Sequence, residues 1–191
     1  MSKNVAIIGA GKVGKAIQQG VERAGFAVKL AGRGQVTEAA AWADIIVLAV
    51  PFAAHTDVAR ELQKAADGKP VIDVSNALTA DMQLAIGFTT SAAEELQKAL
   101  PKAHVVKAFN TVFAQHMSSG SAAGQQLSLF VASNDDAARK AVLQLGKTVG
   151  FDAIDAGPLK NSRHLEAIGY FNIQLGYVLG NGANTGFKYV H

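Results

Sequence analysis

Near its amino terminus the chain reads NVAIIGAGKVG, residues 4–14. Residues 4–8 form a short apolar run rich in β-branched side chains, which predicts a buried β-strand. The run ends in a G-x-G-x-x-G string at residues 9–14. Apolar residues at helical spacing follow over residues 13–24, and Gly25 ends that predicted helix. A strand, a glycine turn and an amphipathic helix in this order predict the start of a βαβ unit.

The alternation of strand-like and helix-like segments continues along the chain. Further strands are predicted at residues 27–31, 44–50, 70–74, 104–108, 127–131 and 151–156. Further helices are predicted at residues 35–41, 53–66, 91–100 and about 135–148, and from residue 161 onward. This order predicts a doubly wound, mostly parallel α/β sheet, a Rossmann-type fold with a C-terminal helix. We expect residues 1–191 to form one dinucleotide-binding domain.

Composition excludes several classes of protein. The 191 residues are 49% hydrophobic and 17% charged, with a net charge of +3 and no cysteine. The lack of cysteine excludes a disulfide scaffold and thiolate metal sites, and the sparse, evenly spread charge does not favour a nucleic-acid-binding surface. The apolar runs are too short to span a bilayer, and no secretory signal opens the chain. We expect a cytoplasmic protein with a small-molecule ligand, no membrane partner and no metal site.

The glycine string predicts a phosphate-binding turn. Gly9 permits a tight turn, Gly11 lets the backbone approach a pyrophosphate, and Gly14 lets the helix pack closely on the strand. The free N–H groups and the positive end of the helix dipole would then bind the phosphates. A plain βα turn is the alternative, but it seldom needs three glycines at this spacing. The predicted phosphate site comprises Gly9, Ala10, Gly11, Lys12, Val13 and Gly14.

The end of the second predicted strand distinguishes between the two pyridine dinucleotides. A site for NAD usually carries Asp or Glu there, on the ribose 2′-hydroxyl. This chain instead reads LAGRGQ, residues 30–35, and has no carboxylate before Glu38. Arg33 could form a bidentate contact with a 2′-phosphate, although a solvated surface arginine is the alternative. We therefore predict NADP(H) rather than NAD as the cofactor.

The residues that follow the other strands are expected to line a crevice at the carboxyl edge of the sheet. They are Val50, Pro51 and Phe52, then Ser75 and Asn76, then Ala108, Phe109, Asn110 and Thr111. This set is amide, hydroxyl and aromatic, with no nucleophilic cysteine and no cluster of histidine with carboxylates. His55 is interpreted as a surface or capping residue.

The same set predicts that no side chain acts as a catalytic acid or base. A carbonyl or imine reductase normally needs a proton donor, whereas hydride transfer between two stacked rings depends mainly on their orientation. The crevice fits the second case better. A donor could still come from His55, Lys107, His116 or His164.

With these motifs together, the chain resembles the family of coenzyme F420-dependent NADP oxidoreductases, which also supplies the cytoplasmic reductase domain of the six-transmembrane metalloreductases. The likeness is carried by GAGKVG (9–14), AGR (31–33), LAVPF (48–52), VIDVSN (71–76), VVKAFNT (105–111) and DAGPLKNSRHLEAI (155–168). The segment AFNT resembles the metalloreductase branch, which pairs NADPH with a flavin.

The resemblance implies roles for the crevice residues. Pro51, Phe52 and Asn76 would flank the ribose and nicotinamide, and Ala108 and Asn110 would face a second ring. That ring would be the deazaflavin F420 or a flavin, FMN or FAD, and hydride would pass directly between the two rings.

Two other functions stay open from the sequence. One is a reductase of a small carbonyl or imine substrate, which would need the last helix to be exchanged within a dimer. The other is a non-catalytic module that senses NADP(H). The C-terminal helix, residues 160–180, carries apolar residues on more than one face, which predicts either a homodimer contact or a buried core helix.

Overall fold

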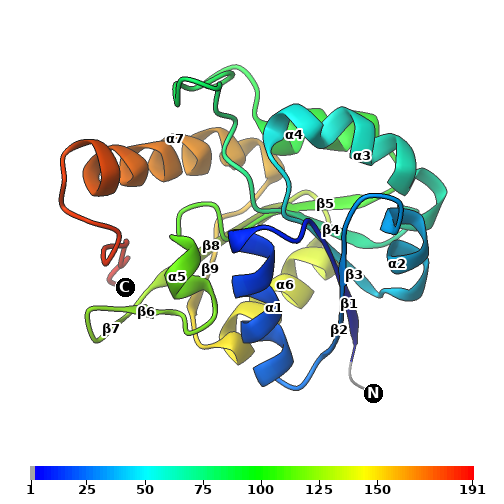
Figure 1. Cartoon of the computed structure of the whole chain (residues 1–191), viewed down its shortest axis with the longest axis horizontal. Coiled ribbons are helices and arrows are strands. Elements are labelled where there is room, and N and C mark those ends of the chain that lie inside the picture. Colours follow the sequence, from blue (N-terminus) through cyan, green and yellow to red (C-terminus); the bar gives the residue numbers. More distant parts are fainter. Residues whose placement is uncertain (1–2) are drawn as a thin grey trace.

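A seven-stranded sheet forms the centre of the computed structural model, which describes residues 3–191 (Figure 1). In spatial order its strands are β2 (Ala27–Ala31), β1 (Asn4–Ile8), β3 (Ile45–Leu48), β4 (Pro70–Asp73), β5 (His104–Lys107), β8 (Ser128–Ser133) and β9 (Asp152–Asp155). The first five strands are parallel, β8 is antiparallel to β5, and β9 is parallel to β8. The predicted doubly wound, mostly parallel fold is confirmed.

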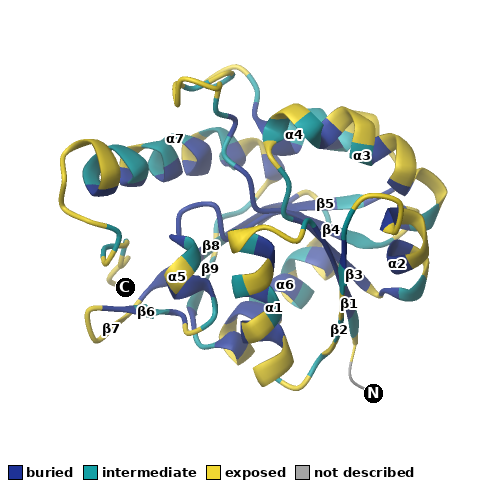
Figure 2. Cartoon of the chain, viewed as in Figure 1, coloured by how far each residue is buried: buried dark blue, intermediate teal, exposed yellow. Residues whose placement is uncertain are grey.

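The sheet is covered by helices on both faces, as its strand sequences predict. In β1, Val5 and Ile7 pack on one face, and Ala6 and Ile8 pack on the other. Helices α1 (Lys12–Arg23) and α6 (Asp136–Val149) cover the first face. Helices α2 (Val36–Trp42), α3 (His55–Leu62) and α4 (Ala92–Ala99) cover the second face. The central strands are therefore buried on both sides, as Figure 2 shows.

Local signals in the sequence fix several helix starts. The Ser91 side chain accepts a hydrogen bond from the Glu94 backbone N–H and caps the start of α4, within the helix predicted at residues 91–100. The Asp135 side chain accepts one from the Ala138 N–H at 2.7 Å and begins α6. The predicted helix over residues 53–66 is wrong as one continuous helix. It is divided into 3₁₀ turns, η1 (Phe52–Ala54) and η2 (Gln63–Ala66), on either side of α3.

Short elements near the end of the chain escaped sequence prediction. Helix α5 (Ala114–Met117) and the hairpin of β6 (Ser121–Ala122) and β7 (Gln125–Gln126) are too short to show a period. After the 3₁₀ turn η3 (Leu159–Asn161), the C-terminal helix α7 (Ser162–Ile173) continues into a π-helical turn, η4 (Gln174–Val178). The last residues then return to the sheet, where Ser128 N–H donates to the Phe187 carbonyl.

Helix α7 extends past the edge of the sheet, beyond α4 and above α5 (Figure 1). Phe171, Tyr177, Val178 and Leu179 are exposed on this helix and the turn after it. The use of α7 in a homodimer stays a prediction. Within residues 3–191, no helix is long and apolar enough to cross a membrane.

Candidate functional site

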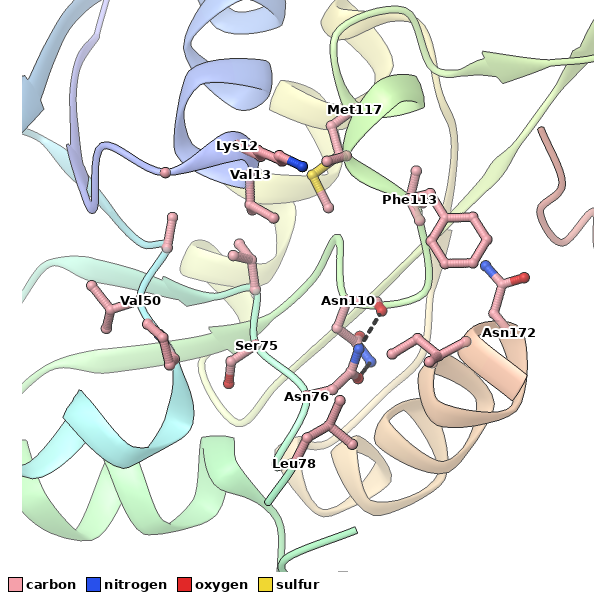
Figure 3. A pocket seen from close by; sticks show the side chains of 18 of the residues that line it. Lys12, Val13, Val50, Ser75, Asn76, Leu78, Asn110, Phe113, Met117 and Asn172 are labelled. Carbon is pink, nitrogen blue, oxygen red and sulfur yellow. Dashed lines mark hydrogen bonds between the residues drawn. The ribbon is translucent and has the colours of Figure 1, made fainter. Parts of the chain in front are cut away.

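A cleft of 490 Å³ opens at the carboxyl edge of the parallel strands (Figure 3). It runs from the start of α1, past the segments that follow β3, β4 and β5, to α5, α7 and η4. Its size is typical of sites for small molecules and cofactors, and its position at the strand ends is where doubly wound folds bind ligands. Seven of the predicted site residues line it, namely Gly11, Lys12, Val13, Val50, Pro51, Asn76 and Asn110.

The glycine turn at the start of α1 is shaped by close backbone contacts. Gly9 has φ +117°, and a Cβ there would lie 2.2 Å from the Ala49 carbonyl oxygen. A Cβ on Gly14 would lie 1.8 Å from the carbonyl oxygen of Gly9. Gly11 differs, because a Cβ on it would meet no heavy atom within 4 Å. The fold therefore requires Gly9 and Gly14, whereas the side of Gly11 faces open space.

The amino-terminal end of α1 is prepared for an anion. No side chain caps this end, and its first turn carries no acidic residue. The backbone N–H groups of the first turn and the positive end of the helix dipole consequently face the cleft without an internal partner. Lys12, at the first position of α1, lines the cleft and points across it toward Met117 in Figure 3.

Arg33 is exposed and lies two residues after the end of β2, the strand that pairs with β1. The turn around it is held by a hydrogen bond of 3.1 Å from the Gly32 N–H to the Gln35 side chain, and Gly34 has φ +78°. Within residues 3–191 the Arg33 guanidinium forms neither an ion pair nor a hydrogen bond with another residue. Its donors are therefore available to an external anion.

Two asparagines form a reciprocal pair in the centre of the cleft. Asn76 Nδ2 donates to the Asn110 carbonyl and Asn110 Nδ2 donates to Asn76 Oδ1, both at 2.9 Å (Figure 3). Asn110 Nδ2 also donates to the Leu165 carbonyl of α7 at 2.8 Å. Gly169 permits this contact, because a Cβ there would lie 2.4 Å from Asn76 Oδ1. The pair therefore joins the ends of β4 and β5 to α7.

The remaining predicted residues do not line the cleft. Ala108 is fully buried in the core on the α1 face. The ring of Phe52 packs edge-to-face on that of His55, with centroids 5.4 Å apart, beside a separate small cavity. Gly9 and Gly14 face the protein backbone rather than the cleft, and Ala10 is exposed in the turn between them.

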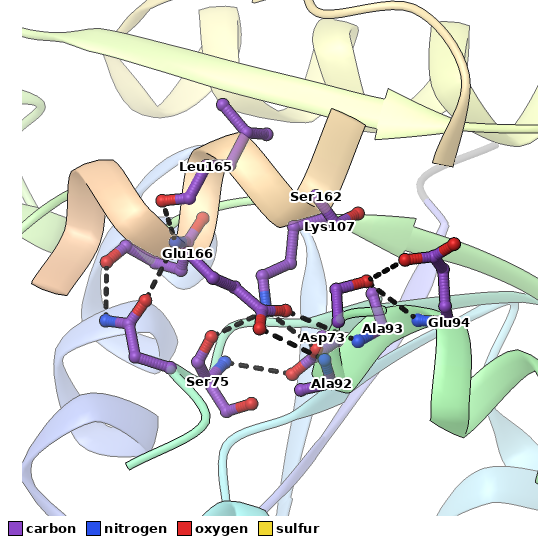
Figure 4. A network of polar contacts seen from close by, with 12 residues as sticks. Asp73, Ser75, Ala92, Ala93, Glu94, Lys107, Ser162, Leu165 and Glu166 are labelled. Atoms are coloured by element: carbon purple, nitrogen blue, oxygen red, sulfur yellow. Dashed lines mark hydrogen bonds and ion pairs between the residues drawn. The ribbon is translucent and has the colours of Figure 1, made fainter. Parts of the chain in front are cut away.

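A buried cluster of charged side chains lies directly behind the cleft (Figure 4). Lys107 Nζ donates to Asp73 Oδ2 at 2.8 Å, to Glu166 Oε1 at 2.7 Å and to the Ser75 carbonyl at 2.6 Å. Glu166 Oε2 also accepts from the Ala92 N–H at 3.0 Å, at the start of α4. The cluster thus connects β4, β5, α4 and α7 at one point.

The interpretation of His55 as a surface residue is wrong. His55 is 5% exposed rather than on the surface, and its Nε2 lies 3.8 Å from Asp73 Oδ1. The sequence did carry one signal. Asp73 and Lys107 each lie one residue before the end of a predicted strand, and they are register partners in adjacent parallel strands. Glu166 gave no such signal, because its partners lie far away in the sequence.

Burial and mutual attraction set the protonation of this cluster. Burial works against the charge on Lys107, but Asp73 and Glu166 hold its pKa above the ordinary value. Burial also opposes the charge on Asp73, yet the Lys107 ammonium holds its pKa below the usual range. Burial raises the pKa of Glu166 despite the nearby Lys107. Asp73 and Lys107 are therefore both charged at neutral pH and form an ion pair.

Burial lowers the pKa of His55 below 6.5, against the attraction of Asp73. The folded protein then keeps His55 neutral at a pH where the unfolded chain takes up a proton. Since the unfolded state binds more protons there, the free energy of unfolding is expected to fall as the pH drops below about 6.5. His55→Phe is expected to remove this part of the pH dependence in denaturant titrations, and His164→Phe is the exposed control. An unchanged slope in His55→Phe would contradict the assignment.

Known proteins resemble this chain in sequence and fold. A family described as NADP oxidoreductase, coenzyme F420-dependent, matches residues 29–77. The metalloreductase STEAP3 of Rattus norvegicus is 28% identical over 179 residues, which cover 86% of this chain and 36% of that protein. The F420-dependent NADP reductase of Methanocaldococcus jannaschii is 28% identical over 137 residues, which cover 69% of this chain and 61% of that protein.

A solved structure extends the likeness over the full chain. The crystal structure of a candidate F420-dependent NADP reductase from Arthrobacter sp. FB24 has a TM-score of 0.92 and 27% identity, and it covers 100% of both chains. These likenesses confirm the resemblance that the motifs predict and the class of NADP-dependent oxidoreductase. The chain spans about a third (36%) of the length of the metalloreductase that it matches.

Proposed function

We propose that the chain, which resembles coenzyme F420-dependent NADP oxidoreductases, binds NADP(H) along the carboxyl edge of its sheet. The bound nicotinamide would exchange hydride with a second ring in the cleft. The observation that carries the proposal is the open side of Gly11 over an uncapped helix end that leads directly into the cleft. A structural turn needs no such space, whereas a pyrophosphate does.

Each part of the edge suits one part of the dinucleotide. The N–H groups at the start of α1, beside Gly11, would hold the pyrophosphate, and Arg33 would hold the 2′-phosphate. Ser75 Oγ is buried beside the cleft and has no hydrogen-bond partner among residues 3–191, so it is placed to donate to a carboxamide or ribose oxygen. Val50 and Pro51 would cover the ribose.

When bound, NADPH would supply the hydride, and the chain's own residues would orient the rings. Lys107 is fully buried, and its three donors are all engaged with Asp73, Glu166 and the Ser75 carbonyl. It therefore holds the backbone of Ser75 in place rather than reaching a substrate. We propose that the Asn76–Asn110 pair and this cluster hold the segments after β4 and β5 that line the cleft. Neither group would exchange protons with a substrate.

Gly11→Val tests the phosphate turn without disturbing the fold. Gly11 has φ −78° and ψ −171°, which a β-branched residue adopts easily, and its side faces open space. We expect the free energy of unfolding to change by less than about 1 kcal/mol. The dissociation constant of NADPH, measured by calorimetry, is expected to rise at least about tenfold, since the new side chain would occupy the place of the pyrophosphate.

The outcome separates a phosphate site from a structural turn. Gly25→Val is the control, because Gly25 lies at the far end of α1 and its side also faces open space. This control is expected to lose stability, since Gly25 has φ +87°, but to keep its affinity for NADPH. Equal affinity of Gly11→Val and the unaltered protein for NADPH would contradict the proposed site.

A further inference from the structure

The far half of the cleft, beyond the Asn76–Asn110 pair, is apolar. It is walled by Leu78, Met82, Val112, Phe113 and Tyr177. Among the residues that line the cleft in the described part of the chain, Lys12 alone carries a charge at neutral pH. Lys12 lies at the other end, beside the phosphate turn. The far half therefore offers no cation to a bound molecule.

Specific contacts between α7, η4 and the segment after β5 hold this apolar wall in place. The rings of Phe113 and Tyr177 pack edge-to-face with centroids 5.0 Å apart. Tyr177 reaches that position through the π-helical turn η4, and a Cβ on Gly176 would lie 2.8 Å from the Phe113 ring. Asn172 Nδ2 donates to the Thr111 carbonyl at 3.1 Å and fixes α7 on the same wall. The π-helical turn at the carboxyl end of α7 therefore forms part of this wall.

The mouth of this half opens to water and carries no positive charge from the residues that line it. Met82 and Tyr177 are 47% and 62% exposed. Asp81 precedes Met82 in the exposed loop, and its hydrogen bond with Thr79 lowers its pKa, so it is negatively charged at neutral pH. A phosphate or carboxylate carried on a bound ring would find no partner in the far half and a like charge in the loop beside it.

We propose that the second substrate enters this half as an uncharged planar ring, namely a quinone or a flavin or deazaflavin ring without phosphate or carboxylate groups. This inference rests on the proposed function. The C–H bond at C4 of the dihydronicotinamide breaks, and its hydrogen and two electrons pass to the ring. NADPH becomes NADP⁺, and the reduced ring takes up one proton from water at the open mouth. Affinity then comes from apolar contact and not from an ionic group.

Matched pairs of acceptors test the charge directly. Riboflavin and FMN differ by one phosphate, and the coenzyme F420 and its tail-less deazaflavin core differ by an acidic tail. We expect NADPH oxidation with riboflavin to have a kcat/KM at least equal to that with FMN, and the deazaflavin core to be at least equal to F420. Menadione is the quinone probe, and its reduction compared with that of riboflavin distinguishes the two neutral ring classes.

A charge placed at the rim should change this preference. Met82→Lys is expected to raise the ratio of FMN to riboflavin kcat/KM about fivefold, since one exposed ion pair contributes about 1 kcal/mol. Val178→Lys is the control, because Val178 is exposed beside Tyr177 but does not line the cleft. The ratio is expected to stay unchanged in that variant.

The outcomes separate the two proposals. Calorimetry with NADPH alone tests the proposed function, and failure to bind would overturn it. If NADPH binds, a tenfold preference for FMN over riboflavin, or for F420 over its core, would overturn the neutral-ring inference alone. Turnover confined to a keto acid or a cyclic imine, or no turnover with any ring acceptor, would overturn that inference as well.

Discussion

Lys107→Met is expected to lower the free energy of unfolding by about 3–5 kcal/mol. Lys107 is fully buried, and it neutralises Asp73 while it holds Glu166 at 2.7 Å. Methionine fills a similar volume but leaves Asp73 buried without a cationic partner, so much of the loss comes from that unpaired charge. Denaturant titration at neutral pH measures the effect, and the midpoint should fall while the slope stays constant.

A surface lysine provides the control for this substitution. Lys98 pairs with Glu95 at 2.8 Å, but its side chain is 69% exposed. Lys98→Met is expected to change the free energy of unfolding by less than about 1 kcal/mol, because water screens an exposed ion pair. Similar losses in the two variants would contradict the view that the buried cluster holds β4, β5, α4 and α7 together.

Arg33→Ala is expected to weaken NADPH binding about 10- to 100-fold and to leave NADH binding nearly unchanged. The two dinucleotides differ only by the 2′-phosphate, and a charge-assisted bidentate contact contributes about 1.5–3 kcal/mol. Arg33 is exposed and makes no contact of this kind within residues 3–191, so its removal should not disturb the fold. Calorimetric titration of each variant with NADPH and with NADH gives the four dissociation constants needed.

Arg60→Ala is the matched control for the loss of one positive charge. Arg60 lies on α3 and pairs with Asp57 at 2.8 Å, away from the cleft. Its removal should leave both dissociation constants within about twofold of those of the unaltered protein. Equal losses of NADPH and NADH affinity in Arg33→Ala would mean that Arg33 does not contact the 2′-phosphate.

The first strand, glycine turn and helix were predictable because each signal is local. Gly9 has φ +117° in this turn, and an added Cβ on Gly14 would lie 1.8 Å from the carbonyl oxygen of Gly9 in the same βαβ unit. The side-chain caps at Ser91 and Asp135 are also local. Such features follow from the spacing of residues a few positions apart, and the fold class follows from their order along the chain.

The buried cluster and the apolar half of the cleft depend on distant contacts. Asp73 meets Lys107 only once β4 and β5 are paired in register, and Glu166 joins them only when α7 lies on that edge. Tyr177 reaches Phe113 through a π-helical turn, whose extra residue per turn leaves no periodic signal in the sequence. His55 was misplaced for the same reason, since its burial is decided by packing against Phe52 and Asp73.

A crystal structure of the chain grown with saturating NADP⁺ tests the central claim most directly. We expect the pyrophosphate on the N–H groups at Gly11, Lys12 and Val13, the 2′-phosphate within hydrogen-bond reach of Arg33, and the nicotinamide beside Ser75 and Asn76. A dinucleotide bound elsewhere, or an empty glycine turn at a concentration that saturates binding in solution, would contradict the account.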